Sequence, residues 1–272
     1  MTTATRSITP VTARRAGFLR DVMSLGGRAL RSIPRDVETL VPALIIPVFF
    51  FIINVGALQD LTEISDGAAA AGFDYKAFQI PVAILFAVTG LSRANILVLD
   101  IQNGYFDRLA LSPVNRLAML LGFMVADMAL AVAMSVPVFV LAFAIGVDFV
   151  TGLPGIVALL VLTVIWAIVY NGFPYAIALK TGNPAAVNSS FIIFFPVVFL
   201  SPVFVPQEAM TGWMETIVRY NPVTYLLRGM RSLISDGWVP EDIFVALLGI
   251  AIIGVVTIPL ATLALLGRVR RS

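Results

Sequence analysis

The chain has 272 residues and contains neither cysteine nor histidine. The lack of cysteine excludes disulfides and thiol catalysis, and the lack of both residue types excludes the usual Cys/His zinc sites. A Ser-His-Asp triad is excluded because there is no histidine. The sequence also lacks a G-x-x-x-x-G-K-[ST] loop, so we expect no ATP bound in the usual way and no metal or cofactor held by this chain.

Charged residues are scarce as well. They make up 12% of the chain, against 59% hydrophobic residues, and the mean hydropathy is +0.97. A soluble domain has about 25% charged and about 45–50% apolar residues. So few charges cannot cover a surface that faces water. The composition therefore predicts an all-α integral membrane protein, and its length accommodates about six transmembrane helices of ~20 residues.

Six apolar runs are the candidate transmembrane helices. They are Val37–Leu58, Ala77–Leu99, Leu117–Val147, Leu153–Leu179, Asn188–Val205 and Ile243–Leu266. They are expected to form a single membrane domain over residues 37–267. A disordered tail (1–13) and an amphipathic segment (14–35) precede this domain, and a short basic tail (268–272) follows it.

The positive charges predict the orientation of the chain. Most of the 18 lysines and arginines lie before the first apolar run, after the last one, or in connections on the same side, whereas most acids lie on the other side. Lysine and arginine are concentrated in the cytoplasmic segments of membrane proteins. We therefore expect both termini to be cytoplasmic, which agrees with an even number of spans.

Residues 14–35 are expected to form an amphipathic helix. On a helical wheel the apolar side chains, among them Phe18, Leu25 and Leu30, fall in one arc, and Arg20 and Arg28 fall opposite. Such a helix lies among the lipid headgroups of the inner leaflet, which makes membrane lipids a partner. The alternative is a basic, disordered tail, which has no need of the periodicity.

The connection after the second apolar run carries the most informative motif. It reads Asp100-Ile-Gln-Asn-Gly-Tyr-Phe-Asp-Arg-Leu-Ala-Leu-Ser-Pro-Val-Asn-Arg116. Gly104 fits the start of a helix or a sharp turn, and Ser112-Pro113 ends a helix. From the residues alone, this segment is either a short amphipathic element that fits a partner's groove or an ordinary turn between helices.

This segment resembles the corresponding loop of the type-2 ABC exporter permeases, in particular their drug and antibiotic resistance branch with the daunorubicin-type transmembrane subunits. Asp100, Gly104, Leu109, Pro113 and Arg116 match the family pattern, whereas Gln102 stands where a second acid is usual and Tyr105 where threonine is common. In that family the segment contacts the ATPase subunit. The resemblance therefore implies these ATPase-coupling residues: Asp100, Gly104, Tyr105, Phe106, Asp107, Arg108, Leu109, Pro113 and Arg116.

The resemblance also implies the partners. A separate cytoplasmic ATPase subunit binds ATP and Mg, and a second permease copy or a paralogue completes the translocation unit as a homo- or heterodimer. Nucleic acid is not an expected partner.

A second resemblance lies in residues 201–231, before the last apolar run. We expect a turn at Pro206, a helix over Ala209–Tyr220, and a second helix after Asn221-Pro222. Related permeases place a pair of short re-entrant helices here, with a similar Asn-Pro-x-x-Tyr stretch followed by arginine. The residues of this outer region are Trp213, Asn221, Pro222, Tyr225, Arg228 and Arg231.

A few residues within the apolar runs are candidates for a translocation path. Arg93 and Asp127 are charged, and ionisable groups inside a bilayer are costly and often functional; a structural pair between them is the alternative. Phe191, Phe194 and Phe195 either line a path for apolar substrates or only pack.

The leading hypothesis is the permease subunit of an ABC exporter in a bacterial plasma membrane. It is not itself an enzyme, and it moves amphiphilic small molecules such as antibiotics, or lipids, outward. A polysaccharide or glycolipid exporter of the same family is one alternative. An ion-coupled carrier is another, although it calls for several intramembrane carboxylates or an inverted repeat. An intramembrane enzyme is a third possibility, but without histidine, cysteine or paired acids the chain has few side chains for catalysis.

Overall fold

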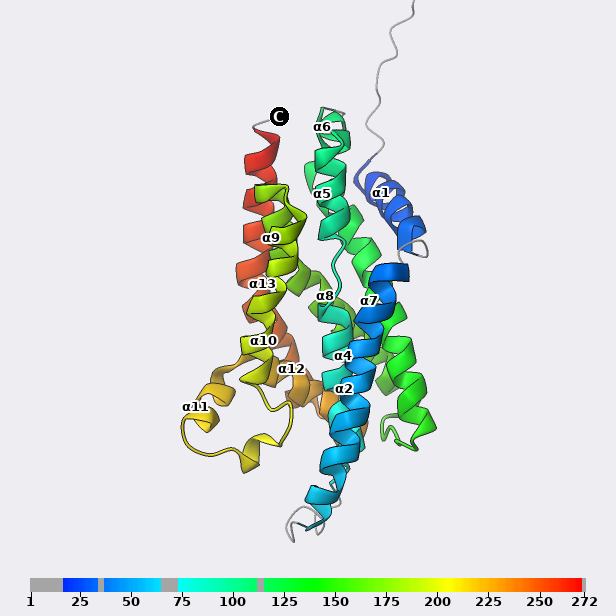
Figure 1. The fold of residues 1–272 in the computed structure, drawn as a ribbon, viewed down its shortest axis with the longest axis vertical. Helices are drawn as coiled ribbons and strands as arrows, with labels where there is room; N and C mark the ends of the chain where they lie inside the picture. The colour runs from blue at the N-terminus through cyan, green and yellow to red at the C-terminus, as the bar shows by residue number, and fades with distance from the viewer. Residues whose placement is uncertain (1–16, 34–36, 65–72, 112–114, 271–272) are drawn as a thin grey trace, which may run out of the picture.

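The computed structural model describes residues 17–33, 37–64, 73–111 and 115–270. Within these ranges the chain is mostly helical and has no strand, as the composition predicts. Long helices run side by side between two ends of the molecule (Figure 1). In chain order the elements are α1 (Phe18–Ser32), α2 (Val37–Ile64), α4 (Tyr75–Thr89), α5 (Ala94–Gln102), α6 (Tyr105–Ala110), α7 (Arg116–Ala144), α8 (Gly152–Thr181), α9 (Pro184–Ser189), α10 (Phe191–Phe199), η2 (Gln207–Ala209), α11 (Trp213–Tyr220), α12 (Pro222–Arg231), η3 (Ser232–Asp236) and α13 (Pro240–Val269).

Five helical runs in the described residues are long and apolar enough to cross a membrane. They are Leu40–Ala57, Tyr75–Gln102, Leu117–Ala144, Gly152–Thr181 and Pro240–Val269. They coincide, within a few residues at each end, with five of the six predicted spans. The predicted tail over residues 1–13 lies outside the described residues.

The second predicted span is not one continuous helix. α4 ends at Thr89 with Gly90 as its C-cap, and α5 begins at Ala94. The four residues between them leave backbone groups without partners inside the helix, so another element must provide those partners. The predicted span 77–99 is therefore corrected to two helices joined by a break at residues 90–93.

The predicted span Asn188–Val205 also differs from the structure. The helical stretch begins earlier, because Asn183 caps α9 through the backbone amide of Ala185 and Pro184 occupies the first helical position. It is interrupted at Ser190 and ends at Phe199. The apolar helical stretch Pro184–Phe199 is shorter than the five long runs.

α1 divides its apolar residues between the protein and the outside. Val22, Leu25 and Ala29 are buried, whereas Leu19 and Met23 are exposed. The buried side packs on α7, where a Cβ added to Gly122 would lie 2.6 Å from the Cβ of Leu25. Glycine at this position therefore permits the close approach of the two helices.

Two apolar cores lie one beyond the other along the bundle. The first contains Ile84, Leu130 and Trp166, and the second contains Leu97, Met119 and Leu179. On each of α4–α5, α7 and α8, the residues of the two cores occupy separate stretches of the helix, with a short gap between them. The residues between the two cores include polar side chains, which are described below.

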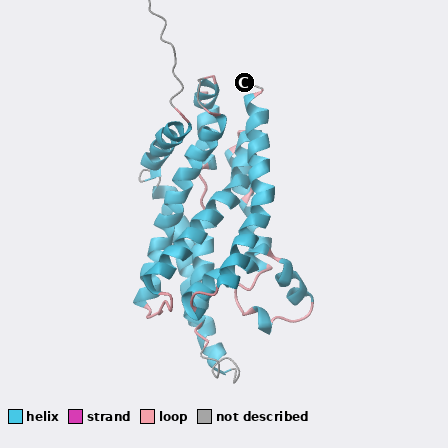
Figure 2. Ribbon diagram, turned by 180° about the vertical axis from the view of Figure 1, so that it is seen from behind, coloured by secondary structure: helices cyan, strands magenta, loops and turns pink. Residues whose placement is uncertain are grey.

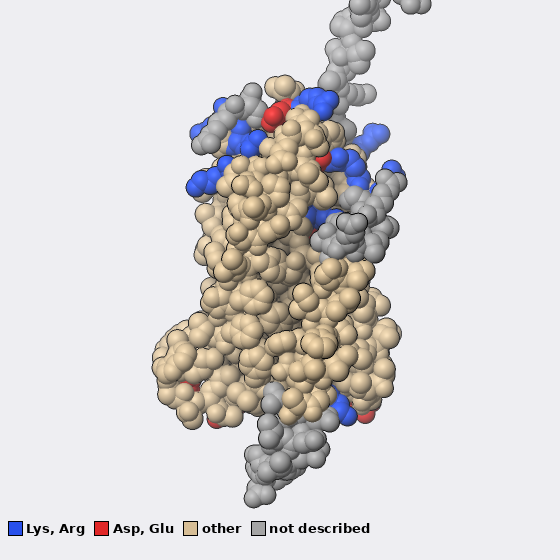
Figure 3. Space-filling model, in the orientation of Figure 1, with Lys and Arg blue, Asp and Glu red and all other residues tan. Residues whose placement is uncertain are grey.

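Charge is concentrated at one end of the molecule. Figure 3 shows Lys and Arg gathered around α1, α6 and the C-terminal end of α13, above a wide region of the same face that carries neither sign. We call this the basic end. The turns of the described chain gather at the basic end and at the opposite end, where α11 projects from the side of the bundle (Figure 2).

The close approach of α1 to α7 predicts different effects for two otherwise identical substitutions. Gly122→Ala places a methyl group against Leu25, and overpacking of this kind costs about 1–3 kcal/mol. Gly27→Ala adds the same group to α1 where nothing lies within 4 Å. We expect Gly122→Ala to lower the melting temperature in detergent and Gly27→Ala to leave it unchanged or raise it. Equal melting temperatures would contradict the packing described here.

Candidate functional site

The short helix α6 stands at the basic end, after a left-handed turn. Gly104 has a φ of +66° and occupies the N-cap of α6, a conformation that L side chains rarely adopt. Arg108 closes the turn: its Nε donates to the carbonyl of Gly104 at 3.1 Å and its Nη2 to that of Asn103 at 3.3 Å. Asn103 and Gly104 thus form a tight turn between α5 and α6, and a new helix begins directly after it.

One side of α6 is fixed and the other is open. Phe106 is 2% exposed and belongs to the second core, so it anchors the helix. Leu111, directly after α6, is 80% exposed, and Arg108 is also exposed. Of the other residues predicted for this surface, Asp107 and Leu109 are half-buried, Pro113 lies outside the described residues, and Arg116 is described only as the first residue of α7.

Arg28 of α1 joins α5 and α6 at this end. Its guanidinium forms an ion pair with Asp100 of α5 and lies 4.3 Å from the centre of the Tyr105 ring. Two further predicted residues of the loop, Asp100 and Tyr105, are therefore held by the amphipathic helix. The sequence analysis placed Arg28 on the polar face of that helix but did not identify its partner.

A polar layer lies between the two apolar cores. It consists of Arg93, Asp127, Asn171 and Tyr175, all less than 4% exposed. One carboxylate oxygen of Asp127 accepts a hydrogen bond from the backbone amide of Arg93 at 2.9 Å, and the other accepts from the Tyr175 hydroxyl at 2.6 Å. Asp127 thereby supplies a partner for an amide at the break between α4 and α5.

The same break receives a second contact from α8. The side-chain amide of Asn171 donates to the carbonyl of Leu91 at 3.5 Å, a long hydrogen bond. α7 and α8 therefore both contribute polar groups to residues 90–93. Because both oxygens of the Asp127 carboxyl group accept hydrogen bonds, the only role that we assign to the layer is to stabilise the break at residues 90–93.

The outer region is tied together by the Asn-Pro stretch. The Asn221 side-chain oxygen caps α12 through the Val223 amide at 2.9 Å, and its nitrogen donates to the carbonyls of Val197 and Leu200 at the end of α10. Pro222 occupies the first position of α12. The break between α11 and α12 thus also fixes the end of α10. The helix predicted over Ala209–Tyr220 begins later, at Trp213, after the short turn η2.

Two arginines of α12 make different contacts. Arg231 lies 3.5 Å from the centre of the Phe78 ring and donates to the carbonyls of Phe78 (3.2 Å) and Pro202 (2.6 Å). Arg228 pairs with Asp242 at 2.6 Å. The other predicted residues of this region lie nearer the surface: Tyr225 donates its hydroxyl to the carbonyl of Arg219 at 2.9 Å, and Trp213 is exposed.

A polar cavity of about 610 Å³ lies at the end of the molecule opposite the basic end. It is bordered by α4, the turn before α8, and α12. Acidic residues outnumber the two arginines in its lining, and burial, together with the charge of Asp242, raises the pKa of Asp236. Phe73 and Phe78 contribute aromatic surface. Its acidic lining residues are Asp74, Asp148, Glu208, Asp236 and Asp242.

The comparison with protein families decides the identity. The family model described as "ABC-2 type transporter" matches residues 20–234, which is most of the chain. The chain belongs to the ABC-2 type transporter family. The match includes α6, the polar layer and the outer region, and it confirms the resemblance noted in the loop after the second span. The protein is a multi-pass membrane permease.

Two kinds of relative illustrate this membership. The daunorubicin resistance ABC transporter permease protein DrrB1 of Streptomyces coeruleorubidus is 27% identical over 255 residues, covering 84% of this chain and 83% of the relative. The probable doxorubicin resistance ABC transporter permease protein DrrC of Mycobacterium tuberculosis, in two strains, is 24% identical over 223 residues, covering 81% of this chain and 79% of the relative.

The phenylalanines proposed for a path occupy different environments in the permease. Phe194 is 2% exposed in the first core, where it contacts the rings of Phe86 and Tyr170. Phe195 is 45% exposed on the outside of α10, and Phe191 contacts Phe194 at its edge. Phe194 therefore packs, and Phe195 belongs to the outer surface of the helix.

The polar layer predicts how Asp127 responds to substitution. Asp127→Leu leaves the Arg93 amide and the Tyr175 hydroxyl without their acceptor in a buried site, at a cost of about 1–3 kcal/mol for each donor. Asp127→Asn keeps one acceptor oxygen of the same shape. We expect a large fall in the melting temperature in detergent for Asp127→Leu and a smaller one for Asp127→Asn. A leucine variant as stable as the wild type would show that the layer is dispensable.

Proposed function

We propose that the permease is driven by a separate cytoplasmic ATPase subunit that docks on Gly104–Leu111, which we call the coupling surface. α6 suits this role because Phe106 holds it firmly while Arg108 and Leu111 face outward. The chain has no ATP-binding loop of its own. ATP and Mg are therefore assigned to the partner.

The orientation and the number of spans support this placement. α1 and the C-terminal end of α13 lie at the same, basic end (Figure 1), so both termini are assigned to the cytoplasm. The chain leaves α8 at the basic end and reaches α11 at the opposite end, and α9 and α10 connect the two. We infer that α9–α10 is the sixth crossing, α1 an interfacial helix, and α11–α12 the pair of short re-entrant helices.

A mechanism follows from the position of α5, which connects α6 to the break beside the polar layer. α5 joins the coupling surface to the break at residues 90–93, where Asp127 holds the first turn of α5. A displacement of α6 by the ATPase is passed along α5 to this break, because α5 lies in the tightly packed second core. The angle between α4 and α5 can then change at residues 90–93 without unfolding either helix.

The proposed cargo is an amphiphilic small molecule of the drug or antibiotic kind. The relatives' names refer to daunorubicin and doxorubicin resistance. The outer cavity, at about 610 Å³, is of the size that holds drug-sized molecules, and its aromatic and acidic lining suits an amphiphile. Polysaccharide or glycolipid export is the alternative within the family. An ion-coupled carrier is disfavoured because the Asp127 carboxylate is engaged on both oxygens.

A second permease copy or a paralogue is proposed to complete the pathway. α2 and α10 both present large apolar side chains to the outside, among them Ile46, Phe49 and Ile192. These faces suit either lipid or a second copy.

The ATPase docking predicts opposite outcomes for two exposed leucines. Leu111 (80% exposed) directly follows α6 at the basic end, whereas Leu153 (73% exposed) lies in the first turn of α8, which begins at the opposite end (Figure 1). Leu111→Asp places a charge in an apolar contact of the coupling surface, so less ATPase is expected to copurify from native membranes. Leu153→Asp is the matched control and is expected to retain the ATPase.

The readout of that experiment is the recovery, by mass spectrometry, of a polypeptide with a G-x-x-x-x-G-K-[ST] loop. If neither the wild type nor the control retains such a protein, the separate ATPase is wrong. If Leu111→Asp retains as much as the control, the docking site lies elsewhere.

The ion pair between Arg28 and Asp100 predicts a rescue by charge exchange. Arg28→Glu and Asp100→Arg each place like charges side by side, which loosens α1 from the coupling surface. The double variant restores opposite charges and is expected to recover part of the lost transport. Cellular accumulation of fluorescent daunorubicin measures this at matched expression. A double variant no better than the worse single variant would contradict the role of the pair.

A further inference from the structure

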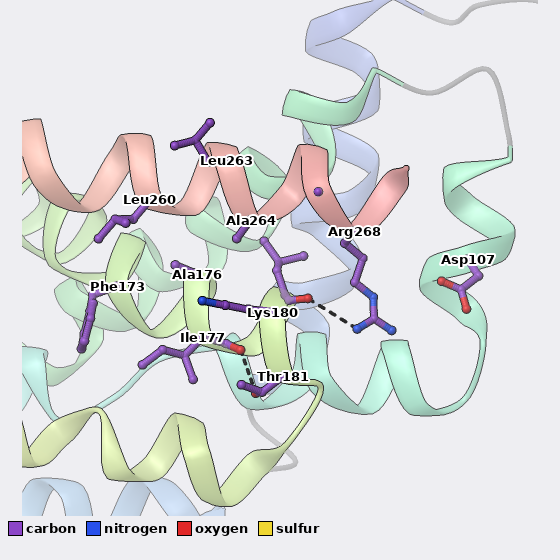
Figure 4. Close-up of a pocket in the computed structure, with 12 residues that line it drawn as sticks. Asp107, Phe173, Ala176, Ile177, Lys180, Thr181, Leu260, Leu263, Ala264 and Arg268 are labelled. Carbon is purple, nitrogen blue, oxygen red and sulfur yellow. Dashed lines mark hydrogen bonds between the residues drawn. The ribbon is translucent and has the colours of Figure 1, made fainter. Parts of the chain in front are cut away.

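A second cavity, of about 650 Å³, lies at the basic end, between α8, α13 and α6 (Figure 4). Most of its wall is apolar and comes from facing positions of α8 and α13, such as Phe173, Ile177 and Ala264. Leu263, on the same wall, is exposed to the outside of the bundle. The cavity therefore opens toward the surface that the membrane covers.

Two cations lie where this apolar wall ends. Lys180 stands in the last turn of α8 and Arg268 in the last turn of α13, and both line the cavity. Arg268 is held in place by the carbonyl of Leu179, 3.4 Å from its Nη1. Lys180 is exposed, and no carboxylate of the described residues forms an ion pair with it.

The lining contains a single acid, Asp107 of α6. Figure 4 shows its carboxylate at the far side of Arg268 from Lys180. Cations in the last turn of a helix also neutralise the helix dipole, which explains one charge per helix by itself. It does not explain an open apolar groove that leads from the membrane face to both charges.

We propose that this cavity binds an anionic phospholipid of the inner leaflet. The headgroup phosphate lies at the end of the cavity that Lys180 and Arg268 line, and one acyl chain lies along the wall formed by α8 and α13. Basic pockets between helices at the cytoplasmic surface bind anionic headgroups in this way, and the long cationic side chains reach toward the interface. A free phosphate ion makes no favourable contact with the apolar wall, whereas an acyl chain does.

The site adjoins the coupling surface through Asp107. A bound phosphate adds negative charge at the end of the cavity that Lys180 and Arg268 line, beside the helix that we assign to the ATPase contact. The lipid thereby joins the ends of α8 and α13 next to α6. This consequence rests on the proposed function, whereas the binding itself does not.

The test measures lipid retention by the purified full-length permease in native mass spectrometry. Phosphatidylglycerol and phosphatidylcholine with identical acyl chains are the probes. The wild type is expected to retain phosphatidylglycerol preferentially, and Lys180→Gln with Arg268→Gln to reduce that retention on the order of tenfold. Lys76→Gln with Arg219→Gln removes the same net charge elsewhere and is expected to leave retention unchanged.

A second variant keeps both charges and fills the groove. Ala264→Trp is expected to displace the acyl chain and to lower phosphatidylglycerol retention as well. Equal retention of the two lipids, or retention that survives the Lys180/Arg268 substitutions, would overturn the proposal. So would displacement of the lipid by inorganic phosphate with no effect of Ala264→Trp, because the site would then recognise phosphate alone. None of these measurements involves the ATPase, so failure of the ATPase docking leaves their outcome unaffected.

Discussion

The fold depends on satisfying backbone groups at a helix break deep inside an apolar bundle. Residues 90–93 interrupt the helical path between α4 and α5, and no water is available in a bilayer core to bind the exposed amides and carbonyls. Asp127 of α7 and Asn171 of α8 provide these partners. An ionisable side chain is thus retained where an apolar one would pack more simply, because its oxygens accept hydrogen bonds at the break.

That break gives the permease two cores instead of one. The core toward the basic end holds α5, the anchor of α6 and the buried face of α1, so these elements form one packed unit. Arg28 extends the unit to Asp100 and Tyr105 at the surface. The ends of α8 and α13 border the same unit, and Lys180, Arg268 and Asp107 line one cavity there. In the proposed mechanism, force applied at α6 acts on this packed unit, which meets the rest of the bundle at the polar layer.

Much of this was predictable from the sequence, and the remainder depends on contacts between distant residues. The long helices and the amphipathic helix α1 follow from hydropathy and periodicity, and the motif from Asp100 to Arg116 indicated the family before any comparison. The break at residues 90–93 was missed, although Gly90 is a local signal, because its stability comes from Asp127, 34 residues away. The Arg28–Asp100 pair spans 72 residues and carries no local signal. The fifth predicted span begins earlier than expected because Asn183 and Pro184 start α9, and it is interrupted at Ser190; a run of apolar residues reveals neither feature.

The central claim is that movement of α6 reaches the polar layer through α5. Hydrogen–deuterium exchange on the permease–ATPase complex, with and without ATP, tests it most directly at the amides of residues 91–94. The account predicts that ATP changes the exchange of both α6 and the Arg93 amide, which Asp127 holds in the resting state. A change confined to α6, with residues 91–94 unaltered, would contradict it.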